Sequence, residues 1–216
     1  MIEPQTIPPK SNAQPVLVIV EGQFDIEFLR RVSHTLHLKE PGLPCLAADE
    51  ASGKAILVPF GGGGHAEWAE RFQSLCLPEF HLFDRETPPE TECRIATAAT
   101  INRREQRHEN AMHRRSLENY LHPDAIAEAL GVSIEFGPQC SVVERVATEL
   151  YETGSFAVPW QELSRKGRHR LFNRLKRRLN TTAADRMSVS RLDQADPACE
   201  IRVWLRLIAD LASGRI

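Results

Sequence analysis

Residues 16–25 have the sequence VLVIVEGQFD, in which five aliphatic residues in a row are followed by Glu21 and Gly22. An unbroken apolar run of this length is typical of a strand that is buried on both faces, as in a parallel sheet covered by helices. From Asp25 to Val32 the apolar residues have helical spacing. The segment therefore predicts a strand, a tight turn and a helix, with an acidic residue where the strand ends.

Short apolar segments at Ala55–Pro59 and Phe80–Phe83 predict two further strands, and Ala111–Arg115 is the candidate for a fourth. Leu38–Ser52, which contains prolines and a glycine, is expected to be a loop. Helices are expected at His65–Leu75, Ala96–Glu109, Asp124–Leu130, Val142–Tyr151, Trp160–Leu179 and Cys199–Leu211.

Strands alternate with helices in the first part of the chain, and only helices follow. This order predicts a small parallel α/β domain at 15–135, after a flexible N-terminus at 1–14 and before a helical C-terminal extension at 136–216. The glycines at 61–64 are expected to form a turn beside the strand ends, because the Gly-Lys-Ser/Thr of a phosphate-binding loop does not follow them.

The composition is that of a globular protein, with 42% hydrophobic and 26% charged residues in 216. The five cysteines are scattered and form no C-x-x-C pair, which favours a reducing compartment over a disulfide or zinc framework. No apolar run approaches the roughly 20 residues that cross a bilayer. We therefore expect a soluble, cytoplasmic protein with no membrane partner.

The formal net charge is only −2, but positive charge is concentrated locally. The segment Arg165–Arg178 contains eight basic residues and no acidic one, and a second basic group, between Arg103 and Arg115, precedes Glu118. Such a patch can bind a polyanion whatever the total charge, although a solvated helix face is an equal alternative for either patch alone. The residues expected to bind nucleic acid are Arg165, Lys166, Arg168, Arg174, Lys176 and Arg177.

Acidic residues stand where the predicted strands end. Glu21 follows the first strand, Asp84 and Glu86 follow the third, and Glu118 follows the candidate fourth. The carboxyl ends of parallel strands form one crevice, so these acids are expected to meet there. Carboxylates held together need a cation, and oxygen ligands favour Mg²⁺ or Mn²⁺. Taken alone, Glu21 or Glu118 fits better as a cap of the following helix, and it is the joint placement of the acids that favours a shared site.

The pattern resembles that of TOPRIM domains. Residues 16–25 resemble the first TOPRIM motif, and Leu-Phe-Asp-Arg-Glu at 82–86 resembles the second, which is usually Asp-x-Asp. Val-Pro-Phe-Gly-Gly at 58–62 matches the strand and turn between them. The segment at 113–121, HRRSLENYL, resembles one in TOPRIM nucleases of the OLD (overcoming lysogenisation defect) group, and 160–211 resembles their helical tail.

This resemblance implies a two-metal site with Mg²⁺ or Mn²⁺. Glu21 would be a metal ligand or a general acid/base, and Asp84 and Glu86 would be the metal-binding pair. Asp25 and Glu118 would help to hold the second metal. Two such ions can stabilise both the attacking and the leaving oxygen of a phosphoryl displacement.

Two further residues take roles from the same resemblance. Ser116 would support the second metal, and Arg114, where relatives often have Lys, would contact the scissile phosphate. The sequence departs from the family pattern at both Arg114 and Glu86. Arginine cannot readily donate a proton, and the longer arm of glutamate can loosen a ligand of Mg²⁺, which has strict octahedral requirements.

The resemblance implies a metal-dependent endonuclease or nickase, with DNA expected rather than RNA as the substrate. A separate ATPase is the expected protein partner, as in anti-phage systems of related proteins. The alternative is a TOPRIM adaptor with weakened metal binding, which Glu86 favours. A primase or topoisomerase fragment is disfavoured by the segment Ser116–Tyr120 and by the lack of a zinc-binding or strand-passage domain.

Overall fold

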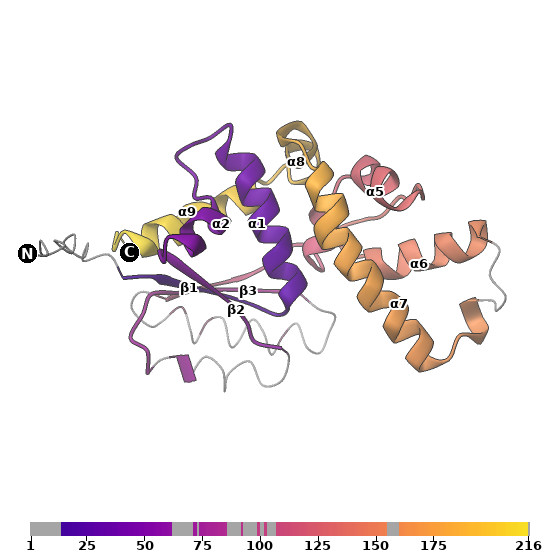
Figure 1. The fold of residues 1–216 in the computed structure, drawn as a ribbon, viewed down its shortest axis with the longest axis horizontal. Coiled ribbons are helices and arrows are strands. Elements are labelled where there is room, and N and C mark those ends of the chain that lie inside the picture. Colours follow the sequence, from indigo (N-terminus) through magenta and orange to yellow (C-terminus); the bar gives the residue numbers. More distant parts are fainter. Residues whose placement is uncertain are drawn as a thin grey trace, which may run out of the picture.

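The computed structural model describes residues 14–61, 71–72, 74–85, 107–154 and 160–215, and also residues 92, 99 and 102. In this part of the chain, strands β1 (Val16–Val20), β2 (Ala55–Pro59), β3 (Glu79–Phe83) and β4 (Arg107–Ala111) form a four-stranded sheet. Its order is β2-β1-β3-β4, and every pairing is parallel (Figure 1). The predicted parallel α/β fold is confirmed.

Strand β1 is central, and all five of its residues are buried. Val16, Val18 and Val20 face the main core, whereas Leu17 and Ile19 face a smaller cluster on the other side of the sheet. Both faces of β1 are covered, which explains why this part of the sequence is continuously apolar.

One face of the sheet is covered by helices from both ends of the chain. Helices α1 (Gln23–His37) and α2 (Leu46–Ala51) follow β1, and α9 (Glu200–Ala212) returns from the C-terminus to pack on β1, β3 and β4 (Figure 1). The C-terminal helix therefore belongs to the helical layer that covers this face of the sheet.

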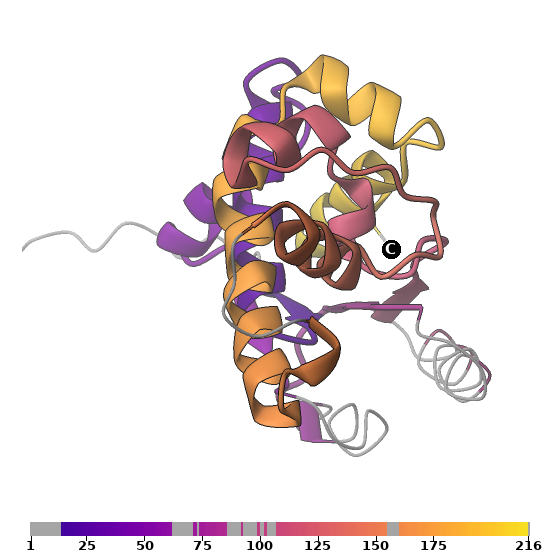
Figure 2. The ribbon, with the colours of Figure 1, turned by 90° about the vertical axis from the view of Figure 1, so that its right-hand side faces the viewer.

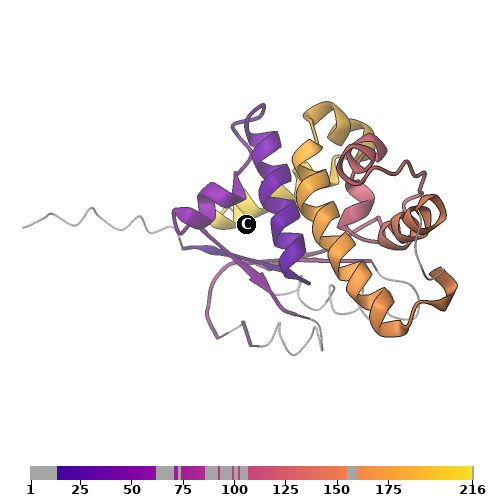
Figure 3. The ribbon, with the colours of Figure 1, turned by 45° about the vertical axis from the view of Figure 1, so that its right-hand side comes forward.

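The remaining helices form a second group beside the sheet. Residues Leu117–Tyr120 (η1) form a 3-10 turn, and α5 (Pro123–Leu130) and α6 (Val142–Thr153) follow it. Next come the short turn η2 (Trp160–Glu162) and α7 (Arg165–Arg178). Helix α7 continues into the π-helical turn η3 (Leu179–Ala183), which packs on α1 and α5 (Figure 3). The group ends with η4 (Ala184–Arg186) and α8 (Val189–Ala195).

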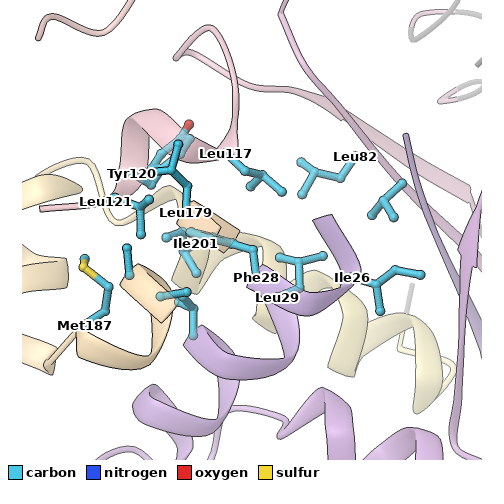
Figure 4. Packing of buried hydrophobic residues seen from close by; sticks show 14 of the residues in the cluster. Ile26, Phe28, Leu29, Leu82, Leu117, Tyr120, Leu121, Leu179, Met187 and Ile201 are labelled. Atoms are coloured by element: carbon cyan, nitrogen blue, oxygen red, sulfur yellow. The ribbon is translucent and has the colours of Figure 1, made fainter. Parts of the chain in front are cut away.

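The core is continuous between the sheet and the helical group. Figure 4 shows Phe28 of α1 among Leu82 of β3, Leu117 of η1, Leu179 of η3 and Ile201 of α9. All five side chains are at most 2% exposed. The C-terminal extension thus shares its hydrophobic core with the α/β domain, which fixes the position of α7 relative to the strand ends.

Three local predictions are wrong. The fourth strand is Arg107–Ala111, four residues before the expected segment, and it also replaces the end of the helix expected at Ala96–Glu109. The expected loop Leu38–Ser52 contains α2, and α8 was not predicted. Among the described strands β4 pairs with β3 alone, and such an edge position accepts charged residues, so it lacks the apolar run by which a strand is recognised.

Gly61, the first residue of the predicted glycine turn, has a φ of +78°, in the left-handed region that glycine adopts without strain. Its backbone N–H donates to the carbonyl of Glu21 at 3.0 Å, so Gly61 lies beside the end of β1. The glycines at 62–64 lie outside the described residues, as do most of the helices expected at His65–Leu75 and Ala96–Glu109.

Candidate metal centre

Four acidic side chains from separate segments gather at the carboxyl end of the sheet. Glu21 follows β1, Asp25 lies in the first turn of α1, Asp84 follows β3, and Glu118 lies in η1. Strands β1 and β3 are adjacent, and the backbone N–H of Asp84 donates to Glu21 Oε1 at 3.2 Å. The predicted convergence of Glu21, Asp84 and Glu118 is thus visible in the structure.

The two carboxylate oxygens of Asp25 differ in their hydrogen bonding. Its Oδ2 accepts a hydrogen bond from the backbone N–H of Gly22 at 2.8 Å, which satisfies a free donor at the start of α1. Its Oδ1 is buried without a hydrogen-bond partner among the described residues. Asp25 is only 2% exposed, so this oxygen is a strong acceptor directed into the acidic cluster.

A lysine from the C-terminal part of the chain lies among these acids. The Nζ atom of Lys176, on α7, is 3.5 Å from Asp25 Oδ1, 3.9 Å from Asp84 Oδ2 and 3.9 Å from Glu118 Oε1. The sequence predicts Lys176 among the nucleic-acid-binding residues of the basic segment. The structure instead directs its ammonium group toward three carboxylates.

Asn180 holds one of these carboxylates in place. It lies one helical turn beyond Lys176, in the π-helical turn η3, and its Nδ2 donates to Glu118 Oε1 at 2.8 Å. Asn180 is fully buried, and its Oδ1 has no hydrogen-bond partner within the described residues. One continuous helical segment therefore supplies both a cation and a hydrogen-bond donor to Glu118, and π-helical turns of this kind are frequent at functional sites.

Burial and the charge of neighbouring carboxylates raise the pKa of Asp25 and of Asp84. Burial raises the pKa of Asp25 to about 6, Lys176 opposes this shift, and the charge of Glu118 adds to it. Burial also raises the pKa of Asp84 well above its usual range, with Lys176 again opposing and Glu21 and Glu118 adding. Burial alone would lower the pKa of Lys176, but the surrounding carboxylates, above all Glu118, raise it. The site therefore favours added positive charge.

The loop that carries Glu118 is fixed by its own side chains and backbone. The backbone N–H of Arg85 donates to the carbonyl of Arg115 at 3.0 Å, which joins this loop to the end of β3. Asn119 accepts from the N–H of Ser116 at 3.2 Å and from its Oγ at 3.0 Å. Asn119 Nδ2 in turn donates to the carbonyls of Gly137 and Cys140, each at 3.0 Å.

Three predicted site residues are not seen at the acidic cluster: two have other contacts, and one lies outside the residues that the structure describes. Ser116 Oγ is hydrogen-bonded to Asn119, so its contact is with the loop that holds Glu118. The guanidinium of Arg114 donates to the carbonyl of Asn119 at 2.9 Å and lies 5.2 Å from the ring centre of Tyr120. Glu86 lies outside the described residues.

The basic segment forms helix α7, whose residues divide between two environments. Arg165, Lys166, Arg174 and Arg177 are exposed, as the nucleic-acid-binding prediction requires. Arg168 instead donates from Nε to the carbonyl of Leu163 at 3.1 Å and lies 5.2 Å from the ring centre of Trp160. The exposed residues lie on the same helix that brings Lys176 to the acids, so the basic surface borders the acidic centre.

Sequence reasoning missed the roles of Lys176 and Asn180 at this centre. Helical spacing carried no signal for Lys176, because Arg174 and Lys176 stand on either side of Leu175 and lie equally far round the helix from the face formed by Leu171, Leu175 and Leu179. Within the run of basic residues, nothing in the sequence distinguished Lys176 from its neighbours.

The residues fit a hard divalent cation chemically. Every donor is a carboxylate oxygen, one of them is a buried oxygen without a hydrogen-bond partner, and the cluster already attracts an ammonium group. As they stand, however, no three His, Cys, Asp or Glu side chains among the described residues are arranged to hold a metal ion. Metal binding would therefore require the carboxylates to close around the ion and Lys176 to give way.

A cavity of about 450 Å³ lies at the amino end of the strands, opposite the acidic cluster. It is lined by Val16 and Ala55, the first residues of β1 and β2, and by residues of α9 such as Ile208. It contains none of the four acids. Size alone would direct attention to this apolar cavity, but the clustered charges are at the carboxyl end of the strands.

No family model matches this chain, and no curated protein matches it significantly. Two solved structures share its fold, and both are of the C-terminal region of the OLD protein of Xanthomonas campestris pv. campestris. The one phased with iodine has a TM-score of 0.52 at 16% identity, covering 95% of this chain and 98% of that one. The one phased with platinum has a TM-score of 0.50 at 16% identity, covering 94% and 95%.

Within the described residues, no helix combines the length and apolarity needed to cross a bilayer.

Proposed function

We propose that this chain is a metal-dependent phosphodiester hydrolase that cuts or nicks nucleic acid, with DNA as its preferred substrate. The observation that carries the proposal is the meeting of Asp25, Asp84 and Glu118 around the ammonium of Lys176, with Glu21 hydrogen-bonded to the backbone of Asp84. Acids drawn from such distant segments are costly to hold together unless they bind a cation.

Mg²⁺ or Mn²⁺, as two ions, is the proposed cofactor. Glu21, Asp25, Asp84 and Glu118 would hold it, and Glu86 would join them as the family pattern implies. When bound, the metal would stabilise negative charge on the attacking and leaving oxygens of the phosphodiester.

The residues of the chain itself would position the substrate and balance charge. Asn180 fixes the orientation of Glu118, and the Gly22 N–H fixes that of Asp25, so both carboxylates are preorganised. Lys176, once withdrawn from the acids, would present its ammonium to the phosphate at the same place. The exposed basic residues of α7 would hold the flanking strand through its phosphates.

The sequence motifs and the fold support the proposal independently of the contacts in the acidic cluster. The motifs at 16–25, 82–86 and 113–121 resemble those of OLD-group nucleases, and the solved structures with the same fold are of an OLD protein. The resemblance also suggests a separate ATPase partner that gates the nuclease, as part of an anti-phage system. Fold likeness alone does not define an activity, so the acidic centre carries the argument.

The experiment is a cleavage assay on supercoiled plasmid, single-stranded DNA and tRNA with Mg²⁺ or Mn²⁺. We expect nicking or cutting that EDTA abolishes and that Glu21→Gln and Asp84→Asn each reduce by at least about a hundredfold, as is typical for groups that act in the transition state. The control variant is Glu135→Gln, since Glu135 is exposed and lies outside the cluster. Cleavage that survives in Asp84→Asn would overturn the proposal.

The second candidate is a nucleic-acid-binding adaptor. It is favoured by the ammonium of Lys176, which already offsets part of the negative charge of the acids, and by Glu86 in place of the usual Asp. Calorimetric titration with Mg²⁺ and Mn²⁺ separates the two. Metal binding that is lost in Asp84→Asn supports the hydrolase, whereas no metal binding together with no cleavage supports the adaptor.

A further inference from the structure

A pocket of about 310 Å³ lies between α6 and α7, on the part of α7 that leads away from the acidic centre. It is lined by Tyr151 of α6 and by Gly167, Arg170, Leu171 and Arg174 of α7. The two helices lie side by side in both Figure 1 and Figure 2. The pocket is within the size range of ligand sites, and its lining combines an aromatic ring with two guanidinium groups.

The two guanidinium groups are not used by the fold. Arg170 and Arg174 are exposed and are four residues apart, so they lie on one face of α7. Neither forms an ion pair or hydrogen bond with any other described residue. In contrast, Arg178 on the same helix donates to the carbonyl of Ala129 at 2.6 Å, and Arg202 pairs with Glu40 at 2.7 Å. Two free guanidiniums at one opening form a site for a phosphate.

The aromatic wall of the pocket is held in a fixed position. The ring of Tyr151 lies 5.6 Å from that of Trp160 at an angle of 59°, and Trp160 lies 5.7 Å from Phe172 of α7. The ring of Tyr151 therefore packs on Trp160, which packs in turn on Phe172, and Tyr151 also lines the pocket. A preorganised ring of this kind is a platform on which a nucleobase can stack.

We propose that this pocket binds one unpaired nucleotide of the substrate, with its phosphate on Arg170 and Arg174 and its base against Tyr151. In a duplex both faces of a base are covered by its neighbours, so the site selects a single-stranded segment. The inference rests on the proposed function and narrows its substrate class to nucleic acid with an unpaired stretch beside the cut.

The position of the pocket agrees with this role. Arg174 and Arg170 precede Lys176 by two and six residues on one helix, which corresponds to about 3 and 9 Å along its axis. One strand advances about 3.4 Å per nucleotide along a helix axis. The nucleotide in the pocket would thus lie within about three nucleotides of the phosphate at the acidic centre.

The test is equilibrium binding in EDTA, where no metal-dependent cleavage occurs. The probes are a labelled oligo-dT, an oligo-U of the same length and a blunt DNA duplex. We expect Tyr151→Leu to weaken binding of both single strands about tenfold and to leave duplex binding unchanged, while Tyr151→Phe keeps the wild-type affinity. Arg170→Ala with Arg174→Ala should weaken single-strand binding and flatten its salt dependence by about one in slope.

The control is Arg206→Ala, because Arg206 is an exposed arginine on α9, away from the pocket. A circular-dichroism melt confirms that each variant is folded. An equal loss on duplex and single strand in Tyr151→Leu, or an unchanged single-strand affinity in that variant, would overturn the nucleotide pocket. Because binding is measured without metal, a failed cleavage assay leaves this result intact, and the two proposals fail separately.

Discussion

The ammonium nitrogen of Lys176 lies 3.5 Å from Oδ1 of Asp25, a carboxylate oxygen that has no hydrogen-bond partner among the described residues. The two residues are 151 positions apart in the chain, and their contact joins α7 to the first turn of α1.

Replacing Lys176 by methionine should destabilise the metal-free protein. Breaking a buried ion pair costs about 3–5 kcal/mol, and because the side chain of Lys176 is 29% exposed we expect about 2 kcal/mol at pH 7.5. Chemical denaturation in EDTA measures this free energy of unfolding. Lys166→Met, at an exposed position of the same helix, should change it by less than about 0.5 kcal/mol. Equal effects of the two substitutions would refute the neutralising role of Lys176.

The stability of the metal-free protein should depend on pH through Asp25. Burial raises its pKa from 3.8 to about 6, so the folded chain holds this proton more tightly than the unfolded chain. The contribution is fully present below about pH 4 and is lost as the pH rises through 6. Asp84 shifts in the same direction.

Asp25→Asn removes that titration, so its effect on stability should depend on pH. We expect it to stabilise the metal-free protein by about 3 kcal/mol relative to wild type at pH 7.5, where wild-type Asp25 is ionised, and by nearly nothing at pH 4. Thermal melts across this range measure the difference. Glu135→Gln, at an exposed position, should give a flat difference curve. A curve for Asp25→Asn that is also flat would show that folding does not raise the pKa of Asp25.

Asn180→Asp should place another carboxylate against Glu118, where the native amide donates a hydrogen bond at 2.8 Å. Losing a hydrogen bond to a charged group costs about 1.5–3 kcal/mol, and we expect at least that loss at pH 7.5. Mg²⁺ should restore more stability to this variant than to Asn180→Ala, since its centre carries more negative charge. Asn173→Asp is the matched control, because Asn173 is exposed on α7. Equal rescue of both Asn180 variants by Mg²⁺ would show that residue 180 does not face the metal.

Asn119→Ala should loosen the loop that carries Glu118. The native side chain makes two hydrogen bonds to Ser116 and two to the carbonyls of Gly137 and Cys140. We expect a loss of about 2–3 kcal/mol in the free energy of unfolding, against about 1 kcal/mol for Ser116→Ala, which removes a single hydrogen bond. Hydrogen exchange of the amides around Glu118 measures the local part of this loss. Wild-type protection in Asn119→Ala would contradict the anchoring role.

The sequence predicted well those elements whose burial is reflected in a run of apolar residues. Strand β1 was placed at its observed bounds because both of its faces are covered. Since β1 and β3 are parallel neighbours, the positions of Glu21 and Asp84 at one rim followed from their places after the two strands. Strand β4 was misplaced because an edge strand rich in charged residues has no such pattern.

The cation at the centre could not be predicted in the same way. The contacts of Lys176 depend on how the C-terminal helices pack against α1, and this is set by tertiary contacts through Phe28 and Leu179 that have no local signature. Arg114 was given a phosphate contact because it lies close to Glu118 in sequence. The structure turns its guanidinium toward Tyr120 and the Asn119 carbonyl, since the loop is folded around that side chain.

The shared core has a consequence for how such a protein can be divided or recombined. Glu21 and Asp84 come from the first half of the chain, whereas Lys176 and Asn180 come from the last quarter. A fragment that stopped near residue 135 would keep the four strands that the structure describes but would lack Lys176, whose charge opposes that of the acids. Gene fusions or exchanges that break the chain between these segments would therefore separate the acids from the lysine and the asparagine that contact them, so a functional recombinant must take both segments from the same parent.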